Sequence, residues 1–263
     1  MVYYSYHSAC SMSSAIDLDL VGKLEALSFR AWPALETRDI GAWRLRLAGG
    51  YTKRANSINA LGRDARFDAD TLGELEAVYR SRGQMPVWRL TPLAPPALEG
   101  RLRARGYRQI DQSLVQRCPL DDRFARDPAV VVHPQPTARW IEAFCQHSPV
   151  APEHREVMQR MLRAIAPPVG FALAEHAGHP CALAIGAVED DHLGLFDVLV
   201  MPQARRQGWA RRVSATLYAW ASGRGARFAY LQVLATNSAA LPLYRSQGFR
   251  TVYDYRYWLP APA

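Results

Sequence analysis

The chain has 263 residues, of which 49% are hydrophobic and 21% charged. These values are typical of globular proteins and exclude a disordered, collagen-like or coiled-coil chain. The length favours two domains, and no apolar stretch is long enough to suggest a membrane span. A net charge of +8 is compatible with nucleic acid, an anionic membrane surface or a phosphorylated small molecule as ligand.

Cysteine usage and the N-terminus favour a cytoplasmic protein. The cysteines lie far apart, without zinc-site spacing or the density of a secreted disulfide framework, at Cys10, Cys118, Cys145 and Cys181. Residues 1–12 lack the basic start and apolar run of a signal peptide, so we expect a disordered extension, with Met12 as an alternative start.

Residues 13–120 form the first expected domain. In it, Trp43 begins an alternating stretch that predicts a strand and breaks at a Gly49-Gly50 turn. A polar, basic stretch containing Arg54 and Asn56 follows this turn.

A polar, Pro-containing segment at 119–130 is the expected linker to a second domain, 129–263. The elements predicted there are a strand at 129–133, helices at 137–147 and 152–165, strands at 169–175, 181–188 and 192–201, a helix at 209–222, a strand at 228–234, a helix at 239–246 and a strand at 249–259. This order predicts an α/β (α+β) fold in which one helix connects strands that can lie parallel.

His176, His179 and Cys181 are the residues that most resemble a metal-ligand set. They flank an Ala-Gly-His-Pro turn between two predicted strands, so we expect a polar hairpin turn and no metal site.

Part of the strand and helix order repeats along the chain. The stretches that begin at Arg82 and Arg224 both run from Arg-Gly through a strand of roughly seven residues and a helix. Gly106-Tyr107-Arg108 then stands opposite Gly248-Phe249-Arg250. The similarity indicates duplication of one supersecondary unit, and the alternative is chance identity between two common strand–helix–strand units.

The stretch 198–212 predicts a phosphate-binding loop. A strand is followed by Arg205, Gly208 and Ala210 in the pattern R-x-x-G-x-A, and then by an amphipathic helix. Glycine permits close backbone approach to a ligand, and the unpaired amides at the start of a helix favour an anion. Arginines at positions 205, 206, 211 and 212 add positive charge.

Asn237, Tyr244 and Gly248-Phe249 follow this loop in the same order as in a known family. Together these motifs resemble the GCN5-related N-acetyltransferases (GNAT) over about residues 129–259. No R-x-x-G-x-A occurs between residues 41 and 82, so the first domain resembles a degenerate, accessory GNAT-like copy.

The resemblance implies a mixed, mostly antiparallel central sheet flanked by helices. It also implies direct transfer, in a ternary complex, of an acetyl group from acetyl-CoA to a primary amine of a small molecule or peptide. The backbone of Val198, Leu199 and Val200 would bind the pantetheine arm. The pyrophosphate would be held by Arg205, Arg206, Gln207, Gly208, Trp209, Ala210 and Arg211.

Two side chains complete the cofactor site that the resemblance implies. Asn237 would contact the cofactor, and Tyr244 would sit beside the thioester sulfur. A phenol with a pKa near ~10 can donate a proton to a thiolate of similar basicity. The alternative for Tyr244 is an ordinary amphipathic tyrosine on a helix.

The general base is less clearly marked. Gln232 stands where ribosomal-protein alanine acetyltransferases carry a catalytic glutamate, and an amide cannot take a proton. The open alternatives are an amine that arrives neutral, a water chain, or a carboxylate at Asp197 or Glu175. Asp197 can equally be a solvent-facing strand residue.

Arg54 and Asn56 are the predicted acceptor-binding residues. Related two-part acetyltransferases have a similar Gly-Gly-x-x-x-Arg-x-Asn segment, which would line an acceptor pocket between the two parts. The alternative is a basic hairpin loop on the surface.

The expected partners are acetyl-CoA and an unidentified amine acceptor, and a homodimer is left open. A weak enzyme or acyl-CoA-binding sensor is the alternative, because the catalytic glutamate is missing and the first domain is degenerate. Nucleic acid is not expected, because the arginines are dispersed and no helix-turn-helix or RNA-binding signature accompanies them. A membrane partner is not expected either.

Overall fold

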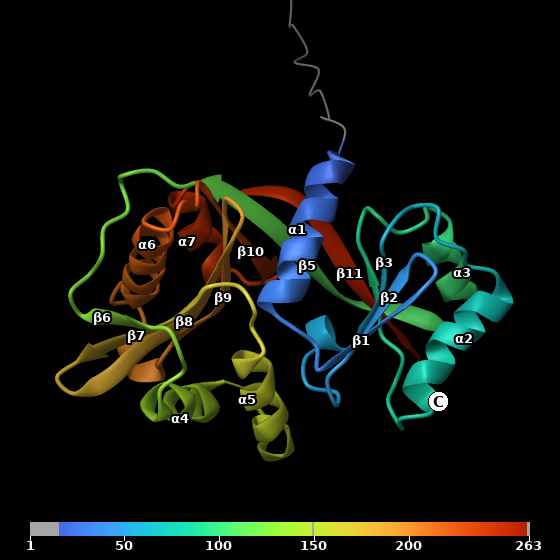
Figure 1. Ribbon diagram of the computed structural model, residues 1–263, viewed down its shortest axis with the longest axis horizontal. Coiled ribbons are helices and arrows are strands. Elements are labelled where there is room, and N and C mark those ends of the chain that lie inside the picture. Colours follow the sequence, from blue (N-terminus) through green and yellow to red (C-terminus); the bar gives the residue numbers. More distant parts are fainter. Residues whose placement is uncertain (1–15, 149, 262–263) are drawn as a thin grey trace, which may run out of the picture.

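The computed structural model describes residues 16–148 and 150–261, so the expected extension at 1–12 lies outside the described residues (Figure 1). Its strands form one sheet in the order β1-β2-β3-β4-β11-β5-β10-β9-β8-β7-β6. The strands are β1 (Glu36–Ile40), β2 (Trp43–Leu47), β3 (Ser57–Ala60), β4 (Trp88–Leu90), β5 (Tyr107–Pro119), β6 (Val130–His133), β7 (Val169–His176), β8 (His179–Glu189), β9 (His192–Val200), β10 (Phe228–Leu234) and β11 (Arg250–Pro260). The helices are α1 (Leu18–Ala31), α2 (Ala69–Arg80), α3 (Leu98–Ala104), α4 (Ala138–His147), α5 (Arg155–Arg163), α6 (Trp209–Ser222) and α7 (Ala240–Ser246).

The predicted fold class is confirmed. Neighbouring strands pair antiparallel except for β3 with β4 and β9 with β10, which pair in parallel. Each parallel pair is connected through a helix, α2 or α6, as parallel strands require. The predicted elements of residues 129–259 are present with small shifts at their ends.

Two sequence expectations need correction. The first strand of the repeat is only three residues long in its first copy, β4, because Pro86 and Pro92 flank it and cannot donate to a sheet ladder. The helix expected at 152–165 begins as a 3-10 turn, Pro152–His154, and becomes α5 at Arg155.

The hairpin predicted at His176 and His179 is confirmed. Ala177 and Gly178 form its turn with φ values of 51° and 79°. Nowhere in residues 16–148 or 150–261 do three or more histidine, cysteine or acidic side chains gather as a metal site would require.

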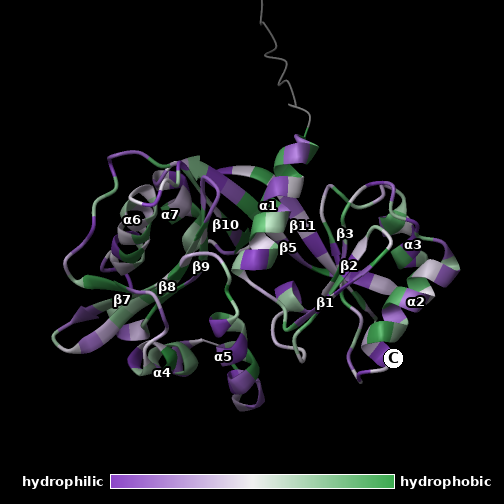
Figure 2. Cartoon of the chain, viewed as in Figure 1, coloured by the Kyte–Doolittle hydropathy of each residue, from purple (hydrophilic) through white to green (hydrophobic). Residues whose placement is uncertain are grey.

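Helices cover both faces of the sheet between β6 and β10. Gly170 of β7 faces α6, since a Cβ atom there would lie 3.2 Å from the ring of Trp220. The next residue, Phe171, points to the opposite face and packs edge-on against Trp140 of α4, with ring centroids 5.4 Å apart. The helices α4, α5 and α6 each carry hydrophobic and hydrophilic residues side by side, as amphipathic covering helices do (Figure 2).

The centre of the sheet is formed by two long strands from distant parts of the chain (Figure 1). β5 lies between β10 and β11, and β11 lies between β4 and β5. Gly106 and Gly248 are 142 residues apart, and so are Ser113 and Tyr255, which face each other in the β5–β11 ladder. The last strand of each similar stretch therefore lies beside the first strand of the other stretch, β11 beside β4 and β5 beside β10.

A buried ion pair fixes α1 against this centre. The side chains of Glu25 and Arg89 are 4% and 2% exposed, and Arg89 Nη2 donates a 2.9 Å hydrogen bond to Glu25 Oε1. The Tyr253 hydroxyl donates to the same oxygen at 2.6 Å. Removing one partner of such a pair leaves an uncompensated buried charge, so α1, β4 and β11 are held together.

Among the helices of the described residues, none combines the length and apolar character of a membrane-crossing segment.

Candidate active site

Strands β9 and β10 separate partway along their length. Their parallel pairing ends at Leu195 and Leu231. Beyond that point β9 continues against β8 and β10 continues against β5. We call this opening the splay. It leaves the backbone of Val198–Val200 without a strand partner on the side of β10, so these groups are available to an extended ligand.

A β-bulge lies where β9 leaves β10. The register with β8 shifts between the pairs Ile185–Phe196 and Leu183–Leu199. Asp197, within this shift, has a φ of 47°, in the left-handed region. Bulges bend a strand, and non-glycine residues in this conformation cluster at functional sites. The bulge therefore places Asp197 at the mouth of the splay.

The loop after β9 leaves the start of α6 open to an anion. Gly208 precedes the helix at φ 81°, and Arg206 has a φ of 64°. In the described chain no side chain caps α6, so its first amides and its positive dipole end are free. Arg205, Arg206 and Gln207 are exposed here, while Trp209 is buried and anchors the helix. This geometry fits the pyrophosphate of acetyl-CoA.

Not every arginine of the predicted loop faces this site. Arg211 Nη2 donates a 2.7 Å hydrogen bond to Ser246 Oγ of α7. Arg212 forms an ion pair of 2.6 Å with Asp127. Of the four loop arginines, Arg205 and Arg206 are therefore the two whose side chains are available to contact a phosphate.

Asn237 and Tyr244 lie at either end of α7. The Asn237 side-chain oxygen accepts a 3.0 Å hydrogen bond from the amide of Ala240, so it caps the first turn of that helix. Tyr244 is 7% exposed, and burial together with the charge of Asp197 raises its pKa to about 12. The phenol is therefore a weaker acid than the sequence estimate assumed, and it remains protonated at neutral pH.

Arg54 reaches the splay from the first predicted domain. Its Nη2 lies 3.3 Å from Asp197 Oδ1, and its guanidinium lies over the rings of Trp32 and Phe196. Burial raises the pKa of Asp197, and the charge of Arg54 opposes this effect. The sequence thus identified two residues, 143 positions apart, that the fold brings into contact.

Asn56 has a different place from the one expected. Its side-chain oxygen accepts from the amides of Ala48 and Gly50, and its Nδ2 donates to the carbonyls of Tyr51 and Thr52. All four contacts are with the loop's own backbone. Asn56 therefore holds the loop that presents Arg54, and its own amide points into that loop.

Gln232 and Glu175 are the two remaining polar candidates from the sequence. Gln232 Nε2 donates to Ser28 Oγ at 2.8 Å, and Gln232 Oε1 accepts from the Tyr255 hydroxyl at 3.0 Å. Glu175 is on β7, separated from β9 by β8, and forms an ion pair with Arg139. Of the two carboxylates considered as bases, the fold brings Asp197 to the splay and leaves Glu175 two strands away.

A cavity of about 210 Å³ contains Arg54 and Gln232 in its walls, and we call it the interface cavity. It is lined by Thr52, Lys53, Arg54, Asp111, Ser113, Gln232, Leu234, Tyr255 and Tyr257. Lys53 Nζ lies 2.9 Å from Asp111 Oδ2. Sequence reasoning missed Lys53 and Asp111, and assigned no site role to Tyr255 and Tyr257. These tyrosines are buried, and they also line the cavity.

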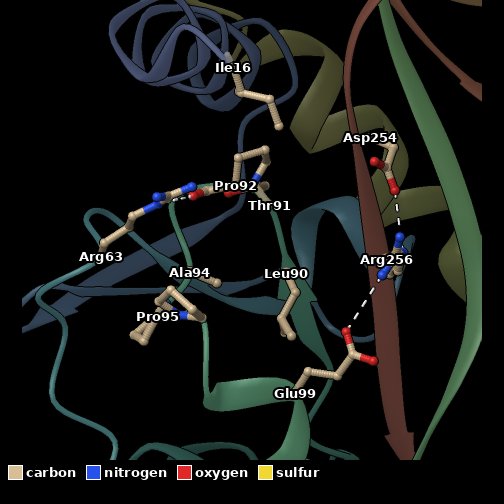
Figure 3. A pocket seen from close by; sticks show the side chains of 11 residues that line it. Ile16, Arg63, Leu90, Thr91, Pro92, Ala94, Pro95, Glu99, Asp254 and Arg256 are labelled. Atoms are coloured by element: carbon tan, nitrogen blue, oxygen red, sulfur yellow. Dashed lines mark hydrogen bonds and ion pairs between the residues drawn. The ribbon is translucent and has the colours of Figure 1, made fainter. Parts of the chain in front are cut away.

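Another cavity, of about 250 Å³, lies beside β4 (Figure 3). Arg63 Nε donates there to the carbonyl of Pro92 at 2.9 Å. Arg256 lies between Asp254 and Glu99, at 3.3 Å and 3.5 Å. These charges pair with one another, and the cavity is separate from the splay.

Comparisons with known proteins agree with this geometry. Residues 21–258 match the family model described as "Probable histone acetyltransferase Rv0428c C-terminal". The uncharacterized N-acetyltransferase YobR of Bacillus subtilis is 28% identical over 249 residues, which cover 91% of this chain and 98% of YobR. The probable histone acetyltransferase Rv0428c of Mycobacterium tuberculosis is 29% identical, over 90% of this chain and 73% of that protein.

The fold is shared with a solved structure. A GCN5-related N-acetyltransferase from Kribbella flavida superposes with a TM-score of 0.65 at 18% identity, covering 92% of this chain and 96% of that one. The chain therefore belongs to the family named after the C-terminal part of Rv0428c, within the GCN5-related N-acetyltransferases, and it is an N-acetyltransferase.

Proposed function

We propose that the chain transfers an acetyl group from acetyl-CoA to a primary amine by direct attack in a ternary complex. The observation that carries this proposal is the splay, which ends beside the uncapped N-terminus of α6. Acetyl-CoA supplies an activated thioester. The residues that would hold it are the backbone of Val198–Val200 and the loop Arg205–Arg211. Holding both reactants in one orientation supplies much of the rate.

Asp197 is the proposed general base. It is the carboxylate at the mouth of the splay, and burial raises its pKa above the usual aspartate value. A raised pKa makes a carboxylate a better acceptor for the proton that the amine must lose to attack the thioester carbonyl. The ion pair with Arg54 keeps it ionised and positions it.

Tyr244 is the proposed general acid. Its hydroxyl stays protonated at neutral pH, and the charge of Asp197 acts on it, so the two side chains share one environment. Proton donation to the departing thiolate completes the transfer, since the base takes the proton that the amine loses.

The interface cavity is the proposed acceptor site. Lys53 and Arg54 each pair with a carboxylate, so the cavity presents both signs of charge over the rings of Tyr255 and Tyr257. Its 210 Å³ is below the ~300 Å³ of usual small-molecule pockets, which fits a small amine or the amine end of a larger acceptor.

The two-part organisation remains a proposal. Residues 13–120 would be an accessory GNAT-like domain and residues 129–263 the catalytic one, with β5 and β11 exchanged between them. Arg54 supports a role for the first part, since it brings charge to the second part's site. Cytoplasmic location and a homodimer stay predictions.

The test is release of the CoA thiol from acetyl-CoA with a panel of amines, comparing the wild type with Asp197→Asn and Tyr244→Phe. Amine-dependent release that falls in both variants supports the proposal. Tight acetyl-CoA binding with no release on any amine would favour the acyl-CoA-sensor alternative, which Gln232 at the usual glutamate position motivates.

A further inference from the structure

An arginine-lined cavity of about 600 Å³ lies away from the splay. We call it the arginine cavity, and it is lined by Arg117, Pro119, Arg123, Arg245, Gly248, Phe249 and Arg250. Pro119 pairs with Phe228, the first residue of β10, whereas the splay opens beside the last residues of that strand. The two sites therefore lie at opposite ends of β10.

Two of these arginines occupy paired positions on neighbouring strands. Arg117 of β5 and Arg250 of β11 are cross-strand partners in the ladder. Like charges in this arrangement are destabilising. Arg117 Nε donates to His192 Nε2 at 3.1 Å, and the guanidinium lies over the Phe228 ring, 3.4 Å from its centroid. Burial lowers the pKa of Arg117, and the charge of Asp191, which contacts the other nitrogen of His192, opposes this effect.

The other two arginines add charge at the same place. Arg245 is in the last turn of α7 and is exposed. Arg123 donates to the carbonyl of Gln247 at 3.3 Å, and its ion pair with Asp121 is half exposed on both sides. Such exposed pairs stabilise little. None of the residues that line the cavity in the described part of the chain is acidic.

A smaller cavity of about 180 Å³ shares Arg123 with this site. It also contains Arg211, from the first turn of α6, and Ser246 of α7. Arginine side chains therefore continue from the loop proposed to hold pyrophosphate towards the arginine cavity.

We infer that the arginine cavity binds the phosphate group of a phosphorylated small molecule. A phosphate dianion in this cavity would meet a wall that holds four arginines and no acidic residue, and guanidinium groups match phosphate oxygens in bidentate geometry. The phosphate can come from the 3′ position of CoA bound at the splay or from a free phosphorylated compound. Only the CoA source rests on the proposed function.

The first arm of the test uses inorganic phosphate at constant ionic strength. We expect phosphate to raise the thermal unfolding midpoint of the wild type, and the Arg245→Gln/Arg250→Gln variant to lose most of that rise. Arg205→Gln/Arg206→Gln removes two charges from the α6 loop, where phosphate can also bind, so this variant should lose only a smaller part of the rise. Arg38→Gln on exposed β1 should keep the whole rise. If the unfolding midpoint of Arg245→Gln/Arg250→Gln without ligand is unchanged or higher, that variant folds. If the midpoint falls, the single variant Arg245→Glu is used in its place.

The second arm compares CoA with 3′-dephospho-CoA by calorimetry. If CoA is the source, the wild type prefers CoA at least tenfold and Arg245→Gln/Arg250→Gln reduces the preference to near one. Either a lost phosphate effect or a lost CoA preference, confined to that variant, supports the inference. The inference is overturned if Arg245→Gln/Arg250→Gln changes neither the phosphate effect nor the CoA preference. It is also overturned if the α6-loop variant loses both to the same extent. A third contradicting result is that Arg245→Gln/Arg250→Gln loses only the binding of a single-stranded RNA oligonucleotide. Failure of both CoA and dephospho-CoA to bind would instead count against the proposed function.

Discussion

The helices α2 and α6 each connect a parallel pair of strands, yet they begin in opposite ways. Asp68 caps α2 by accepting a 2.8 Å hydrogen bond from the amide of Thr71, and this bond lowers the pKa of Asp68 to about 2. α6 begins at Gly208, without a side-chain cap in the described chain. A carboxylate already occupies the anion position at α2, whereas α6 leaves it to a ligand.

The strands beside these helices differ in the same direction. β9 and β10 separate at a bulge and leave backbone groups free beyond Leu195. β4 ends at Leu90 and is followed by Thr91-Pro92, whose carbonyl is bound by Arg63 (Figure 3). One parallel pair thus leaves backbone groups open to a ligand, whereas a backbone carbonyl just beyond the other pair is already bound by an arginine of the same chain. This difference explains why only one region of the sheet is proposed to bind acetyl-CoA.

Gly208→Glu should have the largest effect, because it places a carboxylate at the start of α6, as Asp68 does at the start of α2. We expect acetyl-CoA affinity to fall by about 100-fold or more, since the acid competes with pyrophosphate for the same amides. Gly208→Ala is the control for backbone strain. Alanine is also strained at the φ of 81°, but it adds no negative charge. Isothermal titration calorimetry measures both, and equal losses would contradict the electrostatic explanation.

Asp197→Asn tests the chemistry at the open strand pair. We expect kcat/KM to fall by about 10²-fold, within the usual range for loss of a general base. The base must be ionised, so wild-type activity declines as the pH falls through the raised pKa of Asp197. The variant should lack that acidic limb, and a pH–rate profile that keeps it would assign the limb to another group.

Tyr244→Phe is expected to have a smaller effect. Acetyl transfer should slow by about tenfold, while acetyl-CoA affinity stays nearly intact, because only the proton donor is lost. Single-turnover kinetics and calorimetry together measure the two quantities. Unchanged turnover would exclude Tyr244 as the acid.

Asp68→Ala opens the capped helix and has the smallest expected effect. The unfolding midpoint should drop by roughly 2–4 °C at pH 7, with acetyl-CoA binding and turnover unchanged. The pKa of Asp68 is lowered in the folded state, so its stabilisation is present above the unfolded aspartate pKa and is lost as the pH falls towards 2. The gap in unfolding midpoint between wild type and variant should therefore narrow in acid, and thermal melts from pH 7 down to about pH 3, below the ordinary aspartate pKa of ~3.9, would measure it.

Local patterns in the sequence were sufficient for much of the fold and part of the site. The predicted helix 209–222 and strand 228–234 match α6 and β10. The apolar residues that predicted each segment are largely the residues that the fold buries. R-x-x-G-x-A located the open helix start, since glycine at a left-handed position leaves a signature in the sequence.

Other features depend on contacts between distant residues. The similar segments that contain β5 and β11 do not reveal that each strand pairs beside the other copy, and nothing in the sequence joins Lys53 to Asp111. Asn56 was recognised as important but assigned to an acceptor, because a sequence does not show that its amide binds the loop's own backbone.

The most direct test is a crystal structure with acetyl-CoA bound. The account predicts the thioester between β9 and β10 beyond Leu195 and Leu231, and the pyrophosphate at the amides of Arg206–Arg211. Acetyl-CoA bound instead in the cavity beside β4, against Arg63 and Pro92, would contradict it.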